Sequence, residues 1–332
     1  MSGARSSDLD FGPHEKMVRW IEQTPLGDFP RDLGRRLSKA GPGAWDAWIR
    51  AGALAAARST RHDGVHRMPR GIPVLAAARA LQQGRSPDEG RALLSYALRL
   101  VNREIHDPGF GPFRLLSCDG VPGEGREGTL FSFLEAVRAG EADWADHRFA
   151  WLVQNMEKEQ VIDLLLSSGL EGVAVSAERV AGVVEAVSLL QALGWEHAPV
   201  LLRPVVRHQA AGNWIRSDYD HCRDLTEARD LHRLARRRPP GQPAFGERDV
   251  EGFLAEARDW AEAGPEDRTE RITTALAAGL PLEDAADVVS TAATLLVLQE
   301  ILRRREPKVG EAAFDRAVRV VIGVNALCRL VR

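Results

Sequence analysis

The sequence contains few cysteines, no long apolar run and almost no β-strand pattern. Its 332 residues include three cysteines, at positions 118, 222 and 328, which are too few and too scattered for a disulfide framework or a zinc knuckle. No stretch of about 18 consecutive apolar residues occurs, so no segment is expected to span a bilayer. The first residues carry no apolar core of a secretory signal, and we therefore expect a cytoplasmic protein.

The charge balance argues against a generic nucleic-acid binder. The chain has 44 basic and 47 acidic side chains and a formal net charge of −3, whereas domains that bind polyanions are usually strongly basic. Hydrophobic residues make up 44% and charged residues 27%, which is typical of a soluble globular protein. We therefore expect no nucleic-acid partner and no membrane partner.

Apolar residues recur every three or four positions almost throughout, which predicts an all-α fold, a multi-helix array without a significant β-sheet. Ser86 is expected to cap a helix, with Pro87 at its first position and Glu89 reaching back to the cap. Ser168-Gly169-Leu170 and Ala278-Gly279-Leu280 each precede an alanine- and valine-rich segment, which predicts a weak internal duplication. Further helices are expected to begin near Thr129, Asp143, Val173, His197, Glu247, Leu282 and Glu311.

Breaks in the pattern predict the organisation of the chain. Residues 1–40 are expected to form an N-terminal helical extension, 41–237 the helical core, 238–246 a linker or loop, and 247–332 C-terminal helices on the same core. Two segments rich in glycine and proline, 106–113 and 119–128, predict long connections. Such connections are uncommon in a compact domain unless they cover a site or are mobile.

The common catalytic and metal-binding motifs are absent, including the phosphate loop, G-x-S-x-G, H-E-x-x-H and paired C-x-x-C. His62 and His66 have the spacing that places two imidazoles on one helix face, but Gly64 between them favours a loop. His197 and His208 lie about 16 Å apart if they share one helix, too far to bind one ion directly.

Several charges interrupt apolar helical stretches. Arg79 lies among alanines and leucines, Glu178 and Arg179 precede the apolar run 180–193, and Arg319 stands among valines. A charge in such surroundings must reach solvent or be paired, because burying it alone is costly. Each arginine therefore either extends its head to water along an apolar surface or contributes to an interior polar site.

Three stretches resemble those of questin-oxidase-like proteins, an all-helical family. Gly194 to Pro204 (GWEHAPVLLRP) is similar to the family's I-G-W-x-H-A-x-P-V-L-R, residues 140–146 (GEADWAD) to its D-W-x-x-A-D helix start, and Val324-Asn325-Ala326-Leu327 to its T-N-A-L. The matches keep their order, and the resemblance covers residues 45–332. It implies an oxidoreductase of secondary metabolism with oxygenase-like activity. In fungal relatives it implies a mononuclear non-haem iron, held by histidines and a carboxylated lysine, that cleaves or oxygenates aromatic polyketide rings.

The positions that the resemblance assigns to metal ligands differ in this chain. Arginine cannot ligate a cation, because it stays protonated and has no free lone pair. We therefore expect a degenerate metal site and no cofactor, with non-haem iron rebuilt from His62, His66 or His197 as the alternative. Nine residues of helix turn through about 900°, so Arg70 and Arg79 share a pocket only if Pro73 breaks their helix. The substituted positions are Arg70, Arg79, Glu178, Arg179, Arg319 and Cys328.

The sequence thus predicts a small-molecule-binding helical protein with an arginine-lined interior for an anionic or aromatic, polyketide-type molecule. Glu178 is the candidate general base, with a raised pKa, or a counter-charge. The alternative is a non-catalytic partner or scaffold subunit of an active homologue, in a homo- or hetero-oligomer. Whether the chain is an enzyme stays open. The candidate substrate-binding residues are Arg70, Arg79, Arg179, Arg319 and Trp195. Trp144 is a second candidate wall of the cavity, and a packing role in the core is the alternative for both tryptophans.

Overall fold

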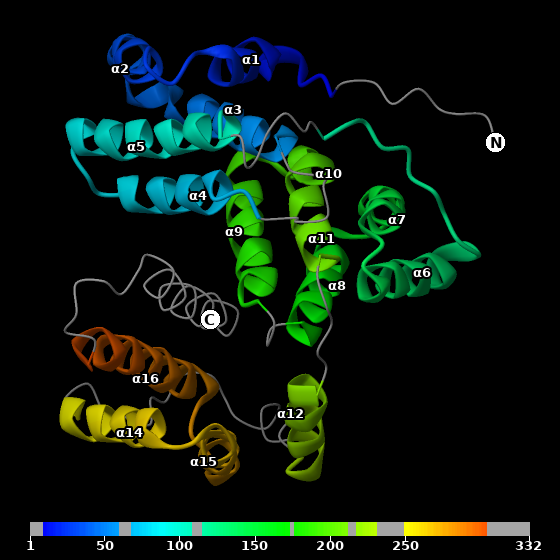
Figure 1. The fold of residues 1–332 in the computed structure, drawn as a ribbon, viewed down its shortest axis with the longest axis vertical. Helices are drawn as coiled ribbons and strands as arrows, with labels where there is room; N and C mark the ends of the chain where they lie inside the picture. The colour runs from blue at the N-terminus through cyan, green and yellow to red at the C-terminus, as the bar shows by residue number, and fades with distance from the viewer. Residues whose placement is uncertain are drawn as a thin grey trace. The chain divides into compact units, whose positions relative to one another are not determined.

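The structure, a computed structural model, describes residues 9–59, 68–107, 115–172, 176–211, 217–230 and 249–303 (Figure 1). These ranges contain helices and connecting loops and no strand, apart from one isolated bridge between Gly123 and Gly125. The protein is therefore all-α, as the periodicity predicts. The chain divides into two compact units: Met1–Gly169 with Glu185–Trp214, and Leu170–Val184 with Ile215–Arg332.

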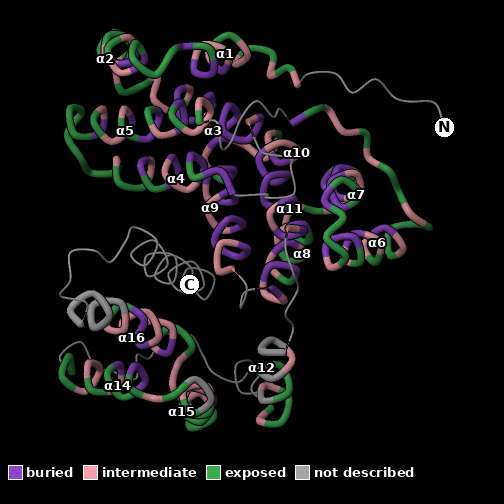
Figure 2. Tube along the Cα trace, viewed as in Figure 1, coloured by how far each residue is buried: buried purple, intermediate pink, exposed green. Residues whose placement is uncertain are grey.

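The N-terminal part of the first unit is built around an alanine-rich helix, α3, which is buried from Trp48 to Arg58. Two glycines let neighbouring helices approach closely. A Cβ atom on Gly52 would lie 2.6 Å from Leu98, and one on Gly71 would lie 2.6 Å from Val101. Figure 2 shows mostly buried residues along α3, whereas buried, intermediate and exposed residues alternate along α2. The helices are α1 (Glu15–Gln23), α2 (Phe29–Ala40), α3 (Trp45–Arg58), α4 (Gly71–Gln82) and α5 (Pro87–Ile105), with 3-10 turns η1 (Gly12–His14) and η2 (Pro42–Ala44).

Helix α5 begins as the sequence predicts. The Glu89 N–H donates to Ser86 Oγ at 3.4 Å, and the Ser86 N–H donates to Glu89 Oε2 at 3.0 Å, so the capping box is confirmed. Near the other end of α5, buried Asn102 donates through Nδ2 to the carbonyls of Ile21 and Thr24, at 2.8 and 2.9 Å. This side chain satisfies carbonyls at the end of α1 and fixes that end to α5.

Arg58, at the end of α3, is 1% exposed and fully hydrogen-bonded. Its Nε and Nη2 donate to the two carboxylate oxygens of Glu22, at 2.8 and 2.7 Å. Its Nη1 donates to Glu15 Oε1 at 2.9 Å and to the carbonyl of Leu9 at 2.8 Å. The buried charge is therefore compensated on every side and joins α1 to α3.

The rest of the first unit surrounds α7, which packs against α6 and α11. Phe133 of α6 and Phe149 of α7 are fully buried, with ring centroids 6.2 Å apart. The helix expected from His197 onward is divided in two, because Pro204 lacks the N–H that a continuous helix would need. The elements are α6 (Gly125–Ala139), α7 (Ala142–Asn155), α8 (Lys158–Glu171), η3 (Trp195–His197), α10 (Ala198–Leu201), α11 (Arg203–Gln209) and α9 (Glu178–Leu193), whose first residues belong to the second unit.

The second unit has its own core around Trp260, which is 1% exposed. Arg268 donates through Nε to the carbonyl of Trp260 at 2.8 Å and through Nη2 to that of Ala263 at 2.8 Å. These carbonyls lie at the C-terminus of the helix 250–262, where a positive charge is favoured by the negative end of the helix dipole. The unit contains α12 (Ser217–Ala228), α14 (Val250–Glu262), α15 (Pro265–Ala278) and α16 (Leu282–Arg303).

Several expectations about helix ends can be compared with the described residues. Helix α16 begins at Leu282, as predicted, whereas α6 begins at Gly125 rather than near Thr129. Gly169 lies inside α8, while Gly279 follows α15 with a φ of +105°, so the two glycines of the predicted duplication occupy different backbone positions. The predicted linker 238–246 and the helix expected near Glu311 lie outside the described residues, and the predicted domain boundaries stay a prediction.

No helix among those described has both the length and the apolar character needed to cross a membrane.

Candidate functional site

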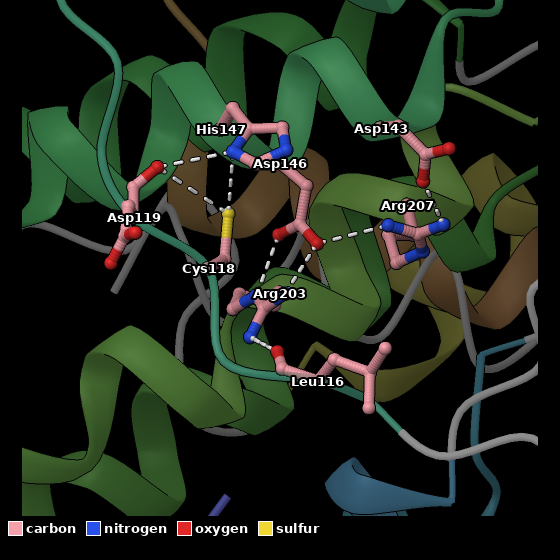
Figure 3. Close-up of polar contacts among 8 residues, drawn as sticks. All are labelled: Leu116, Cys118, Asp119, Asp143, Asp146, His147, Arg203 and Arg207. Atoms are coloured by element: carbon pink, nitrogen blue, oxygen red, sulfur yellow. Dashed lines mark hydrogen bonds and ion pairs between the residues drawn. The ribbon is translucent and has the colours of Figure 1, made fainter. Parts of the chain in front are cut away.

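A buried cluster of charged side chains joins α7 to α11 (Figure 3). Arg203 donates through Nε to Asp146 Oδ1 and through Nη2 to Asp146 Oδ2, both at 2.7 Å. Its Nη1 donates to the carbonyl of Leu116 at 2.7 Å. Burial alone would lower the pKa of Arg203, but the hydrogen bonds and charge of Asp146 outweigh burial and raise it. We call Asp143, Asp146, Arg203 and Arg207 the Asp146 cluster.

Arg207 lies one helical turn after Arg203 and is 3% exposed. Its Nη1 donates to Asp146 Oδ2 at 2.9 Å, and its Nη2 donates to Asp143 Oδ1 at 2.6 Å. The Asp143 side chain is 83% exposed, in contrast to Asp146 at 3%. The Nε of Arg207 is buried and has no acceptor within the described residues. Arg207 is therefore less completely paired than Arg58 or Arg203.

A thiol and an imidazole meet next to this cluster. Cys118 Sγ lies 3.1 Å from His147 Nδ1, and the same nitrogen lies 3.0 Å from the carbonyl oxygen of Asp119 (Figure 3). Because a carbonyl can only accept, the contact with Asp119 favours the tautomer that carries hydrogen on Nδ1. Burial raises the pKa of Cys118 to about 11, and the charge of Asp146 raises it as well. The sulfur is therefore a neutral thiol at physiological pH, not a pre-ionised nucleophile.

The loop that carries Cys118 lies directly on α7. The Val121 N–H donates to the carbonyl of His147 at 3.1 Å, and Arg148 Nη1 donates to the carbonyl of Val121 at 2.9 Å. Arg148 also lies over the ring of Trp144, 5.5 Å from its centroid, and that ring is largely exposed. The glycine-rich connection predicted for this region thus has a fixed course where it borders the cluster.

The predicted ligand residues on α4 do not come together. Helix α4 is continuous from Gly71 to Gln82, so Pro73 does not break it; a proline in the first turn needs no intrahelical N–H bond. Arg70 precedes the helix and is exposed, while Arg79 in the last turn pairs with Asp46 at 3.2 Å. Nine residues of unbroken helix place the two side chains on opposite faces.

The N-terminus of α4 meets a buried carboxyl group instead. Glu104 accepts hydrogen bonds from the backbone N–H groups of Arg70 and Gly71, at 3.2 and 2.9 Å. Burial raises the pKa of Glu104 to about 7, although these hydrogen bonds act in the opposite direction. This residue was not singled out by the sequence.

Glu178 and Arg179 begin α9, in the second unit. Arg179 is buried, its guanidinium lies against Gly172, and burial lowers its pKa. Trp195 belongs to the first unit, where Lys158 Nζ lies 5.8 Å from its ring centroid. Arg319 and Cys328 lie outside the described residues, so the structure does not test the predicted arginine-lined interior as a whole.

His197 forms an aromatic pair with His14 rather than meeting His208. The ring centroids lie 5.8 Å apart in an edge-to-face arrangement, and Arg50 Nη1 lies 3.4 Å from His14 Nε2. Burial lowers the pKa of both histidines, and the charge of Arg50 lowers them as well. Both imidazoles are therefore neutral at physiological pH. His62 and His66 lie outside the described residues.

Within the described ranges, no three histidine, cysteine, aspartate or glutamate side chains are grouped in a way that could hold a metal ion. Comparison with protein-family models, with curated proteins and with solved structures finds no match.

The Asp146 cluster was not predicted from the sequence, although its residues carry a recognisable spacing. Asp143 and Asp146 are three residues apart and Arg203 and Arg207 are four apart, so each pair lies on one helix face. That complementary spacing was the available signal. Nothing in the sequence indicated that the two faces meet.

Proposed function

We propose that the chain is a small-molecule-binding helical protein whose ligand is an anion, bound in the first unit at the guanidinium of Arg207. The observation that carries this proposal is the difference between Arg207 and two other buried arginines of the unit. Every guanidinium nitrogen of Arg58 and of Arg203 donates to an acceptor of the chain. Arg207 has a buried Nε without an acceptor among the described residues.

The electrostatics support an anion rather than a neutral ligand. Arg203 and Arg207 contribute two positive charges and Asp146 one negative charge, and all three side chains are almost fully buried. The second negative charge is that of Asp143, whose side chain is 83% exposed. Taking a charge out of water is costly unless it is paired, so the buried guanidinium of Arg207 favours an anion that also fills its Nε. A guanidinium donates in a planar fork, which suits carboxylate, phenolate or phosphate oxygens.

Titration of the full chain with benzoate, acetate and inorganic phosphate, at constant ionic strength and followed by calorimetry, tests this proposal. Arg207→Lys keeps the charge but loses the planar fork, and we expect it to weaken binding about tenfold or more. Arg58→Lys is the matched control, since it also replaces a buried arginine but one whose donors are occupied by Glu15 and Glu22. Equal affinities in the wild type and Arg207→Lys would contradict the proposal.

The sequence predicts an anionic or aromatic, polyketide-type ligand, so an aromatic anion is compared with an aliphatic one. We therefore expect benzoate to bind more tightly than acetate. A polyketide-type substrate, an oxygenase-like activity and the relationship to questin-oxidase-like proteins stay predictions from the resemblance. The proposal takes the protein to be cytoplasmic and without a nucleic-acid partner, in agreement with its charge balance.

A second candidate function is that of a non-catalytic subunit that pairs with a homologous helical chain. The apolar side chains of Trp144 and Val121 favour it, because both are exposed beside His147. Native mass measurement of the complex purified from its source distinguishes the two functions. A stable assembly with a homologue supports the subunit, whereas a monomer that binds benzoate supports the first proposal.

A further inference from the structure

Two arginines of the first unit show how this protein binds a carboxylate. Arg58 uses its Nε and Nη2 to hold both oxygens of Glu22, at 2.8 and 2.7 Å. Arg203 uses the same two nitrogens to hold both oxygens of Asp146, each at 2.7 Å. This edge of the guanidinium presents two parallel N–H groups, which match the two oxygens of a carboxylate.

The corresponding edge of Arg207 is only partly used. Its Nη2 donates to one oxygen of Asp143 at 2.6 Å, and its Nε has no acceptor within the described part of the chain. Arg207 itself is 3% exposed, so the unfilled Nε is a buried donor rather than one that water surrounds. Buried donors without an acceptor are rare in folded proteins and often mark the place of a missing ligand or water.

Asp143 can leave this position more easily than Asp146 can. Its side chain is 83% exposed, so a rotation carries the carboxylate into solvent without opening the core. Water stabilises the released carboxylate, and the incoming carboxylate takes its place beside the buried guanidinium, so the exchange leaves no buried charge unpaired. Asp146 is buried and held by both arginines, so it keeps Arg203 and the other side of Arg207 in place.

The end of α7 also favours a second anion here. Asp143 lies in the first turn of this helix, where the backbone N–H groups carry partial positive charge. The side chain of Glu141, the N-cap residue, makes no capping hydrogen bond to this N-terminus. An incoming anion that takes the place of Asp143 therefore stays within the same favourable field.

We propose that Asp143 is an internal competitor that occupies the Nη2 side of Arg207 until a carboxylate ligand displaces it and binds the Nε–Nη2 edge through both oxygens. This inference rests on the proposed function and adds the ligand class and the way in which the site is regulated. The ligand carboxylate then repeats at Arg207 the arrangement of Glu22 on Arg58 and of Asp146 on Arg203. The apparent affinity of the wild type is reduced by the fraction of time that Asp143 occupies the site.

The test compares Asp143→Asn with Glu141→Gln in the full chain, using acetate, benzoate and chloride as probes at constant ionic strength. Glu141 is the matched control, because it is an exposed acidic residue just before α7 and its replacement changes the net charge equally. We expect Asp143→Asn to tighten acetate and benzoate binding about fivefold, since the Asp143 carboxylate no longer competes for Arg207. We expect Glu141→Gln to leave both affinities unchanged, and chloride, with its single acceptor atom, to bind less tightly than acetate to every form.

The outcomes separate this inference from the function on which it rests. If the wild type binds benzoate but Asp143→Asn binds it equally or more weakly, the role of Asp143 as a competitor is overturned, while the proposed anion site at Arg207 is retained. If chloride, which offers a single acceptor atom, binds as tightly as acetate, the two-point carboxylate contact is overturned. If no form binds any of the anions, the proposed function fails and the inference fails with it.

Discussion

Cys118 Sγ lies 3.1 Å from His147 Nδ1, yet the pair is not a thiolate–imidazolium pair. Burial raises the pKa of the thiol to about 11, and Asp146 contributes in the same direction. A nearby imidazole therefore does not activate this sulfur, because a buried carboxylate disfavours a second negative charge beside it.

The first prediction concerns the reactivity of Cys118. Compared with a thiol of the ordinary pKa of 9.0, Cys118 has a thiolate population at pH 8 that is about a hundredfold smaller. Each thiolate is about tenfold more nucleophilic, because nucleophilicity rises with the pKa, so the net reaction rate falls about tenfold. We expect labelling by iodoacetamide to be about tenfold slower than for the same residue in the urea-unfolded chain. Mass spectrometry of the peptide containing Cys118 measures both rates, and equal rates at pH 8 would exclude the raised pKa.

The second prediction separates the two carboxylates of the Asp146 cluster. Asp146→Ala leaves two buried guanidinium groups without their shared partner, and we expect a loss of about 3–5 kcal/mol. Asp143→Asn changes an exposed partner and should cost less than about 1 kcal/mol. Hydrogen exchange in peptides from α7 and α11 reports these changes locally. Similar losses in the two variants would show that Asp146 is not the central charge of the cluster.

The helices were largely predictable because their signals are local. Ser86 and Glu89 form their capping box without help from the rest of the chain. Similarly, Leu282 begins its helix where the pattern places it. The region around Pro204 shows the limit of this reasoning. The apolar pattern continues through it, yet α10 ends at Leu201 and α11 begins at Arg203.

The cluster was not predictable because it depends on which helices are neighbours. Asp146 and Arg203 lie in two of the stretches that resemble questin-oxidase-like proteins, 140–146 and 194–204. In the structure these two residues are partners in one buried ion pair. Arg79 shows the reverse, a residue predicted to lie in an interior site that instead lies near the surface. Its apolar neighbours in sequence suggested an interior site, but its own face of α4 reaches Asp46 near the surface.

The third prediction is a pH dependence that originates at Glu104. The pKa of this carboxyl is about 7 in the folded chain, against an ordinary value of 4.5. The folded chain therefore binds the proton more tightly than the unfolded chain does. The stabilisation is fully present below pH 4.5 and is lost as the pH rises through 7. The loss is about 3 kcal/mol by pH 8.

Glu104→Gln should remove this slope, because the amide does not titrate. Hydrogen exchange in peptides from α4 and α5, measured between pH 5 and 8 and corrected for the intrinsic rates, reports the local free energy of opening. Glu89→Gln is the control on the same helix, since hydrogen bonds from Ser86 lower the pKa of Glu89 instead. A slope that persists in Glu104→Gln would assign the pH dependence to another group.

The last prediction concerns the contact of Gly120 with α7. A Cβ atom on Gly120 would lie 2.7 Å from the backbone nitrogen of Trp151 and 2.8 Å from its Cα. These are backbone atoms within a helix and cannot move aside, so Gly120→Ala must lift the loop. We expect a loss of about 1–3 kcal/mol and the breaking of the hydrogen bond from the Val121 N–H to the carbonyl of His147.

The same change should alter the chemistry of the neighbouring thiol. When the loop lifts, Cys118 loses the burial that raises its pKa, so its labelling by iodoacetamide at pH 8 should approach that of the unfolded chain. Gly43→Ala is the control, because a Cβ atom there meets nothing within 4 Å. A Gly120→Ala protein with unchanged stability and unchanged labelling would show that the loop does not need its close approach to α7 to keep the thiol protonated.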